Sequence, residues 1–292
     1  MNTKKLLLKG AILLPLSLLF ACGGGEKKSE NDTTLTDSTA EESLAEDKKS
    51  FNYILPSPLQ IASIFHRAKL KFDDKLLNKA ESVSKYNTEI KLTLNMGIYA
   101  TDLAYCLLNS QNQLSLSYLK TTRDLADKIG MGSVYNTEAL VERFQKNIDN
   151  VDTLSDIIST IQTESEAFLE ENERRFTALC IFSGAWIEAI YMASKTIENK
   201  FNDKIALEMS EQHVSLRNLI KLLDEHSESK QPEFSEVLTK LKEINALFEN
   251  TAGYKAQPLE DGEDMPLSFQ LTPEETKIIG AKVKELRNLV VN

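Results

Sequence analysis

The sequence contains few of the residues that interrupt helices or hold metals. Only 11 Gly and 7 Pro occur in 292 residues, together with 3 His, 3 Cys and 1 Trp. Scarce glycine and proline leave long stretches free to form helices, because these two residues interrupt regular structure most strongly. The histidines are scattered and form neither an HExxH nor a Glu-x-x-His pair, which excludes the common zinc and di-iron motifs. We therefore expect neither a metal nor a cofactor.

Signatures of catalysis and of nucleic-acid binding are missing as well. The sequence has no G-x-S-x-G nucleophile elbow, no phosphate-binding loop and no dinucleotide fingerprint. Its formal net charge is −10, whereas a protein that binds a polyphosphate needs a basic face. These absences favour a protein that is not an enzyme and that does not bind nucleic acid, with an enzyme as the least favoured alternative.

The N-terminus has the order of features expected of an export signal. Lys4 and Lys5 precede a mostly apolar stretch, 6–20, that is too short to span a bilayer comfortably. The stretch leads into Leu19-Phe20-Ala21-Cys22, which resembles the lipobox of bacterial lipoproteins. The resemblance covers only the first 22 residues. It implies that residues 1–21 are a signal peptide removed by signal peptidase II and that the Cys22 thiol carries a diacylglycerol.

The resemblance also implies where the protein is located. Two or three acyl chains anchor a protein firmly in a membrane, because each buried methylene contributes about 0.8 kcal/mol. In enterobacterial lipoproteins an Asp after the lipidated cysteine favours retention in the inner membrane, and this sequence has Gly23 there. We therefore expect a lipid-anchored protein of the cell envelope, at the outer membrane rather than the inner one. The resemblance does not distinguish the periplasmic face from the surface.

The region that follows, 22–50, is predicted to be a lipidated, disordered linker. From Gly23 onward it has almost no large apolar side chain, so it cannot bury enough surface to offset the entropy of ordering. A flexible chain of this length typically reaches about 30 Å. A sorting signal within its alternating acids and lysines is an alternative interpretation.

Residues 51–292 are predicted to form one all-α domain, a single bundle of about eight or nine helices. Apolar residues recur at spacings of three and four, and no run of alternating residues suggests a strand. Ser57 and Thr272 each precede a proline and have a glutamine or glutamate three residues later, which predicts helix starts with capping boxes. Gly130 is placed to end a helix. A long helical stretch is predicted from Leu154 as far as Glu198.

Two of the predicted helices are apolar on nearly every side and are expected at the centre of the bundle. They span about 88–108 and 176–195. Such a helix is either a membrane span or a core helix. Ser183, Gly184 and Glu188 near the middle of the second helix favour the core, because a charge at mid-bilayer costs several kcal/mol.

Each central helix contains one acid among apolar residues, Asp102 in the first and Glu188 in the second. A buried carboxylate must be paired, hydrogen-bonded or protonated. One interpretation is a ligand pocket at the bundle centre, lined by the two acids and by aromatic neighbours on the same helices: Tyr99, Tyr105, Trp186 and Tyr191. The favoured interpretation is structural, with the acids held by a tyrosine hydroxyl, by an arginine such as Arg174 or Arg175, or at a solvent-exposed edge.

Three further features have competing interpretations. Cys106 and Cys180 are expected to be buried free thiols, although the envelope permits a disulfide between them. His213 lies near an apolar stripe and is expected to be a packed residue. Gly97 and Gly184, each followed by an aromatic residue and an acid, form a faint internal echo that suggests two duplicated halves.

The segment 251–271 lacks helical periodicity and carries several acids, but these acids do not have the spacing of an EF-hand calcium loop. We expect a solvated loop that Tyr254, Met265, Phe269 and Leu271 could pin to the bundle.

The expectations for function are ordered. The first is a lipid-anchored envelope protein whose helical domain binds a protein partner or has a structural role, without catalysis. The alternative is a small-ligand binder with a pocket near Asp102 and Glu188. A groove lined by exposed apolar side chains would favour the first, and a closed cavity with converging carboxylates would favour the second.

Overall fold

The structure is a computed structural model, and it describes residues 60, 63, 71–135, 138–257 and 266–292. The predictions for the signal peptide, Cys22, the linker and the Ser57 cap lie outside the described residues, as does Met265. Within the described ranges the fold is all-α and contains no strand, which confirms the predicted class.

The described residues form ten α-helices and three short 3-10 helices. Eight of the α-helices have nine or more residues, in agreement with the predicted number. In chain order the elements are η1 (Asp74–Leu76), η2 (Ala80–Lys85), α3 (Glu89–Leu108), α4 (Asn112–Lys128), α5 (Gly132–Tyr135), α6 (Glu138–Lys146), α7 (Val151–Glu171), α8 (Arg175–Glu198), α9 (Asp203–Glu225), η3 (Ser227–Lys230), α10 (Pro232–Glu249), α11 (Ala252–Ala256) and α12 (Pro273–Val291).

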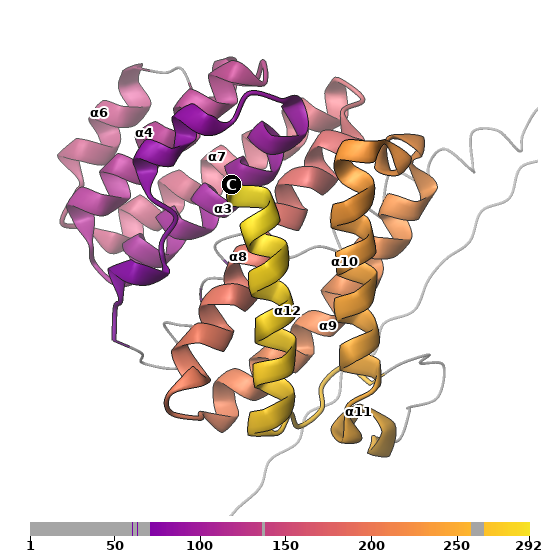
Figure 1. Ribbon diagram of the computed structural model, residues 1–292. Helices are drawn as coiled ribbons and strands as arrows, with labels where there is room; N and C mark the ends of the chain where they lie inside the picture. Colours follow the sequence, from indigo (N-terminus) through magenta and orange to yellow (C-terminus); the bar gives the residue numbers. More distant parts are fainter. Residues whose placement is uncertain (1–59, 61–62, 64–70, 136–137, 258–265) are drawn as a thin grey trace, which may run out of the picture. The chain divides into compact units, whose positions relative to one another are not determined.

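Helices α3 and α8 are the two predicted central helices, and they pack against each other more extensively than any other pair in the described chain. Helix α4 covers α3, while α9 and α12 cover α8 (Figure 1). By length and composition α8 could cross a membrane, but 78% of its apolar window is buried inside the bundle. This burial confirms the interpretation of α8 as a core helix.

Two glycines allow the central helices to touch backbone to backbone. A Cβ atom on Gly97 would overlap the carbonyl oxygen of Ile181, and one on Gly184 would overlap that of Leu94. Each carbonyl belongs to the residue three positions before the opposite glycine, so the contact is reciprocal. The crossing therefore has an approximate two-fold relation between the glycines that form the sequence echo.

The predicted continuous helix from Leu154 to Glu198 is wrong, because the chain turns between α7 and α8. Glu173 has a φ of 56°, a left-handed conformation that is uncommon for a residue other than glycine. The N–H of Arg174 donates to the carbonyl of Leu169 at 2.8 Å, which closes the end of α7 in the manner of a Schellman motif. The sequence has neither glycine nor proline at this turn, so its apolar periodicity continues through the break.

The other helix ends follow the sequence more closely. Thr272 and Glu275 form the predicted capping box at the start of α12. Gly130, with a φ of 76°, follows the C-cap residue of α4 as predicted. The short apolar stripe formed by Leu76, Leu77, Ala80 and Val83 predicts a helix, and in the structure it falls on η1, η2 and the residues between them rather than on an α-helix.

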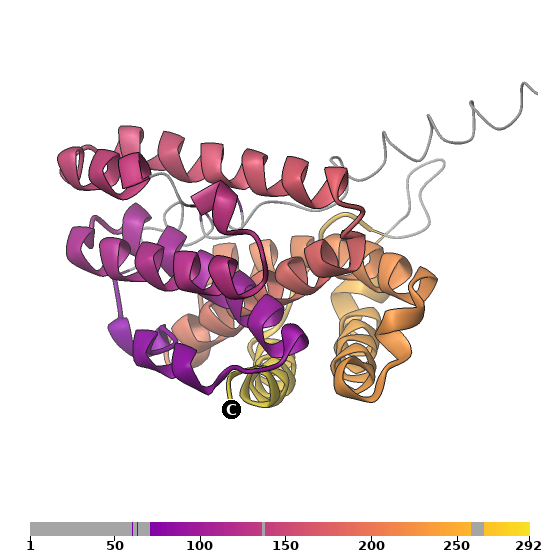
Figure 2. The same cartoon turned by 90° about the horizontal axis from the view of Figure 1, so that it is seen from above.

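The buried side chains form two hydrophobic clusters, one on each side of the α3–α8 crossing. The first is built mainly from α3, α4 and α7, and the second mainly from α8, α9, α10 and α12. In Figure 2 the pink helix α7 lies along the outer edge of the first half, with the orange and yellow helices of the second half on the opposite side. We call these the N-terminal half (71–171) and the C-terminal half (175–292).

Candidate functional site

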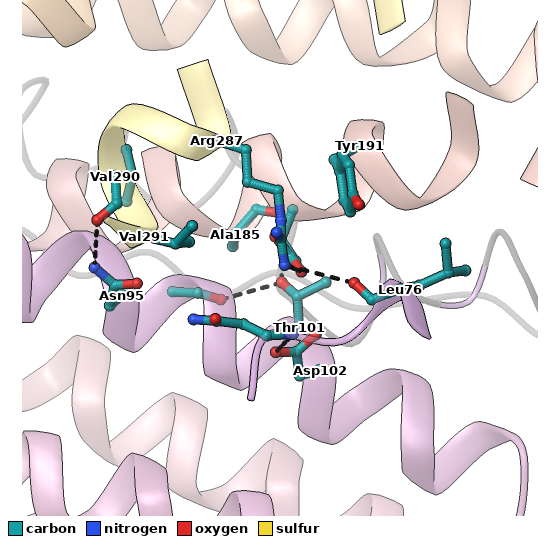
Figure 3. Close-up of polar contacts among 12 residues, drawn as sticks. Leu76, Asn95, Thr101, Asp102, Ala185, Tyr191, Arg287, Val290 and Val291 are labelled. Atoms are coloured by element: carbon teal, nitrogen blue, oxygen red, sulfur yellow. Dashed lines mark hydrogen bonds and ion pairs between the residues drawn. The ribbon is translucent and has the colours of Figure 1, made fainter. Parts of the chain in front are cut away.

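The centre of the bundle contains a buried ion pair between Glu188 of α8 and Arg287 of α12. The guanidinium donates two hydrogen bonds to the carboxylate, from Nε to Oε2 at 2.5 Å and from Nη2 to Oε1 at 2.7 Å. Glu188 is completely buried and Arg287 is 8% exposed. The guanidinium also lies 4.2 Å from the ring centroid of Tyr191 (Figure 3). Paired hydrogen bonds of this kind are the strongest way to hold a carboxylate away from water.

The electrostatics of Arg287 agree with this pairing. Burial acts to lower the pKa of Arg287, but attraction and hydrogen bonding to Glu188 outweigh burial and raise that pKa above its ordinary value. A buried pair compensates the cost of desolvation only when its remaining donors are satisfied. Here Nη2 of Arg287 also contacts the carbonyl oxygen of Leu76 at 3.5 Å.

Asp102 of α3 lies beside this pair and is also completely buried. Burial and the nearby Glu188 carboxylate raise the pKa of Asp102 well above its ordinary value, although Arg287 acts in the opposite direction. Oδ2 accepts a hydrogen bond from the Asn78 N–H at 3.2 Å, while Oδ1 receives none from any donor in the described chain. A raised pKa favours the neutral form of a buried carboxyl group.

Asn78, between the two 3-10 helices, connects the acid pair to the surrounding helices. Its carbonyl accepts from the Tyr118 hydroxyl at 2.8 Å, and its side-chain amide donates to the Tyr86 hydroxyl at 3.0 Å. The Tyr86 hydroxyl in turn lies 3.4 Å from the carbonyl oxygen of Val291 at the end of α12. Nearby, the Asn95 amide donates to the carbonyl of Val290 at 3.0 Å (Figure 3). The C-terminal helix is therefore joined to the N-terminal half through polar groups.

Of the six residues proposed for a pocket, Asp102, Glu188 and Tyr191 lie around Arg287. The polar atoms of the other three have separate partners: the Tyr99 hydroxyl donates to the carbonyl of Lys79, the Tyr105 hydroxyl accepts from the N–H of Asp73, and the Trp186 indole donates to the carbonyl of Gln212. The described geometry therefore does not direct all six side chains towards one point. Aromatic residues near an acid in sequence point to several sides here, because both central helices are buried on every side.

The arginine that holds the acids also differs from the two suggested by the sequence. Arg174 donates to the carbonyl of Ile129 at 2.7 Å and forms an ion pair with Glu89 at 3.3 Å. Arg175 is exposed. The partner is Arg287, 99 positions after Glu188. The sequence marks that part of the chain as helical but does not indicate that Arg287 is buried.

This arrangement is suited to holding helices together rather than to chemistry. Both carboxyl groups are completely buried, and their partners are protein groups. Acid–base catalysis needs a group that can reach a substrate, and binding needs polar atoms that converge on open space. The favoured structural interpretation of Asp102 and Glu188 agrees with this geometry.

His213 is packed in the C-terminal half, as expected. Its ring contacts those of Phe248, Tyr254 and Phe269, with centroid separations of 5.3, 5.3 and 5.9 Å. Nε2 lies 3.0 Å from Oδ1 of Asn245, while Nδ1 has no hydrogen-bond partner in the described chain. Burial lowers the pKa of His213 to about 4, so the ring is neutral at physiological pH. Tyr254 and Phe269 thus pack the two described ends of the 251–271 segment against the bundle, although the expected loop begins with a short helix, α11.

The two cysteines of the central helices are free and buried. Cys106 belongs to the N-terminal cluster and Cys180 to the C-terminal cluster. Burial raises the pKa of each thiol, so neither has the character of a reactive nucleophile. Within the described ranges no group of three potential ligands could hold a metal ion.

An open cleft lies at the surface where the N-terminal turns of α3, α8 and α10 meet. Its volume is about 430 Å³. The apolar part of its lining includes Ile90 and Phe176, and the Phe176 ring packs edge-on against Phe234 at 5.1 Å. Four glutamates and one arginine provide the charged part of the lining: Glu89, Glu173, Glu228, Glu233 and Arg174. No feature of the sequence indicates this cleft, because its walls come from three separate segments.

Comparisons with protein-family models, with curated proteins and with solved structures give no match to this chain. Its function is therefore argued from its own residues.

Proposed function

We propose that the protein is a lipid-anchored lipoprotein of the bacterial envelope whose helical domain binds a protein partner and does not catalyse a reaction. The observation that carries this proposal is the order of features from Lys4 to Cys22: positive charge, a short apolar stretch, then Leu-x-Ala-Cys. Each feature alone is common, but a lipid anchor needs all of them in this order.

The geometry of the domain supports the second part of the proposal. The two buried acids are held by protein groups, which leaves the small-ligand alternative without its polar residues. The surface has instead an open cleft whose lining includes partly buried apolar side chains. Sites for protein segments commonly combine such apolar side chains with a charged rim.

The anchor is tested with Cys22→Ser in cells labelled with an alkynyl palmitate. We expect the variant to lose the label and to keep its signal peptide, because the thiol is the site of acylation. The matched control is the double variant Cys106→Ala/Cys180→Ala, which retains Cys22 and should remain labelled. If Cys22→Ser is processed and membrane-bound like the parent, the anchor is disproved.

The partner is tested by crosslinking in the native envelope, followed by mass spectrometry. We expect a defined protein to be captured by the parent chain. Recovery of no protein, together with a small molecule that copurifies with the domain, would instead support the ligand-binding alternative.

A further inference from the structure

We propose that the cleft between α3, α8 and α10 binds a basic segment of a protein partner, a contact that the acidic outer face of α7 extends. This inference deepens the proposed function and rests on the interaction role assigned there. It identifies the chemistry of the partner: lysine or arginine side chains next to apolar ones.

The first argument is the charge of the cleft. Its lining has four glutamates against one arginine and one histidine, His226. Glu89 forms an ion pair with Arg174, and Glu233 accepts a hydrogen bond from Thr88. Glu228 accepts a hydrogen bond from the Ser227 hydroxyl at 3.1 Å. Glu173 and Glu228 are both exposed, so their carboxylates are accessible to a cationic group.

The second argument is the helix that leads to the cleft. No lysine or arginine occurs between Lys146 and Arg174, whereas eight acids do. In α7 the acids are exposed: Asp152, Asp156, Glu164, Glu166, Glu170 and Glu171. The last two of these lie in the final turn of α7, immediately before Glu173 of the cleft.

This distribution of charge is unfavourable for the isolated helix. Glu166 and Glu170 are four residues apart and repel each other. Acids in the last turn of a helix also face the negative end of its dipole. A basic partner would lessen both the repulsion between the acids and their unfavourable interaction with the helix dipole. Solvent alone does not supply this positive charge.

The third argument is the apolar wall of the cleft. Phe176 is only partly buried and forms part of the lining. An aromatic face beside carboxylates suits the stem and head of a lysine or arginine, because the ring contacts the methylenes and attracts the cation. The volume of about 430 Å³ lies at the small end of the range for binding sites, roughly 300–1,000 Å³. This size suits one or two inserted side chains.

The test uses the full-length protein purified in detergent and a fluorescent peptide of alternating lysine and leucine. We expect saturable binding that weakens with salt. Glu173→Gln/Glu228→Gln should raise the Kd roughly five-fold, as expected for the loss of two partly exposed charge contacts.

The matched control is Asp203→Asn/Glu274→Gln, which removes the same charge from exposed positions in the first turns of α9 and α12. The cleft lies at the N-terminal end of α8, a helix of 24 residues that is therefore about 36 Å long. Asp203 follows the other end of this helix. This control should leave the Kd unchanged.

Three results would overturn the inference. One is an equal loss of affinity in both double variants, which would mean that only the overall charge matters. Another is the absence of saturable binding. The third is binding of a glutamate–leucine peptide or of inorganic phosphate in the cleft, which would make the three helix N-termini an anion site.

The inference and the proposed function can fail separately. If the envelope crosslink captures a partner and Glu173→Gln/Glu228→Gln does not reduce the yield of that partner, the cleft is not the binding site, but the proposed interaction role remains. If the cleft binds the peptide but Cys22→Ser behaves like the parent, the cleft remains and the lipid anchor is wrong.

Discussion

The N-terminal and C-terminal halves each place one acid in the middle of an almost wholly apolar helix, and they compensate its charge differently. In the N-terminal half the pKa of Asp102 is raised, which favours its neutral form, and its carboxyl accepts a hydrogen bond from the backbone N–H of Asn78. In the C-terminal half Glu188 is paired with Arg287. Two buried acids on neighbouring helices are therefore stabilised in different ways, one by a raised pKa and one by an arginine.

The two halves are alike at the point where they meet. At Gly97 and at Gly184, a carbonyl group of the opposite helix occupies the space where any other residue would have a Cβ. The same requirement is therefore met with the same residue on both sides, whereas the acids a short distance along each helix differ, Asp102 on one and Glu188 on the other.

The largest expected effect comes from breaking this likeness. Gly97→Ala or Gly184→Ala places a methyl group on backbone that cannot move aside, so we expect a loss of stability of about 4 kcal/mol or more in either variant. Thermal unfolding followed by circular dichroism measures it. Gly280→Ala serves as a comparison, because its Cβ would meet only the Ser194 side chain, and it should cost less. Unequal losses for Gly97→Ala and Gly184→Ala would argue against a reciprocal crossing.

The next effect separates the two ways of holding an acid. Arg287→Met leaves Glu188 buried without its partner, and removing one partner of such a pair typically costs about 3–5 kcal/mol. Adding Glu188→Leu should restore most of that stability, because well-packed apolar residues replace buried ion pairs at little cost. Urea unfolding of the double-mutant cycle tests both steps. If the double variant is as unstable as Arg287→Met, the pair has a role beyond charge compensation.

The C-terminal half is expected to weaken in acid because of His213. Its folded pKa of about 4 lies below the ordinary value of 6.5, so the unfolded chain binds a proton more readily. The stabilising effect is complete above pH 6.5 and is lost as the pH falls towards 4. By linkage this loss is worth about 3 kcal/mol. His213→Gln should flatten the dependence of stability on pH in this window, as measured by urea unfolding, and an unchanged slope would contradict the assignment.

The N-terminal half is expected to respond to pH in the opposite direction. Because the folded pKa of Asp102 is raised, its contribution is complete below the ordinary value of 3.8 and declines as the pH rises towards the folded value. Asp102→Asn keeps an acceptor for the Asn78 N–H and does not titrate. The variant should therefore gain stability relative to the parent as the pH rises, in the same unfolding assay. A constant difference between the two proteins would show that Asp102 is not protonated on folding.

Much of the fold could be predicted because its signals are local. The two central helices followed from apolar residues on every side, and the start of α12 followed from Thr272 and Glu275. The break between α7 and α8 could not be predicted, because it depends on a non-glycine residue, Glu173, in a left-handed conformation. Apolar periodicity alone does not reveal a turn after which the apolar residues continue at the same spacing.

The candidate site divides in the same way. Burial of Asp102 and Glu188 followed from their apolar neighbours, but the identity of their partners depends on tertiary contacts. Arg287 and Asn78 reach the acids from elements that lie far away in sequence. The cleft at α8 was missed for the same reason, since it exists only after three helix starts have come together.

The late position of Arg287 has a consequence for how the protein is made. A ribosome adds Glu188 to the chain 99 residues before it reaches its partner, Arg287. Until then, closing the core around α8 would enclose an uncompensated negative charge, so the growing chain gains little by folding early. A chain that stays open until its last helix emerges is one that can still be threaded through a narrow pore.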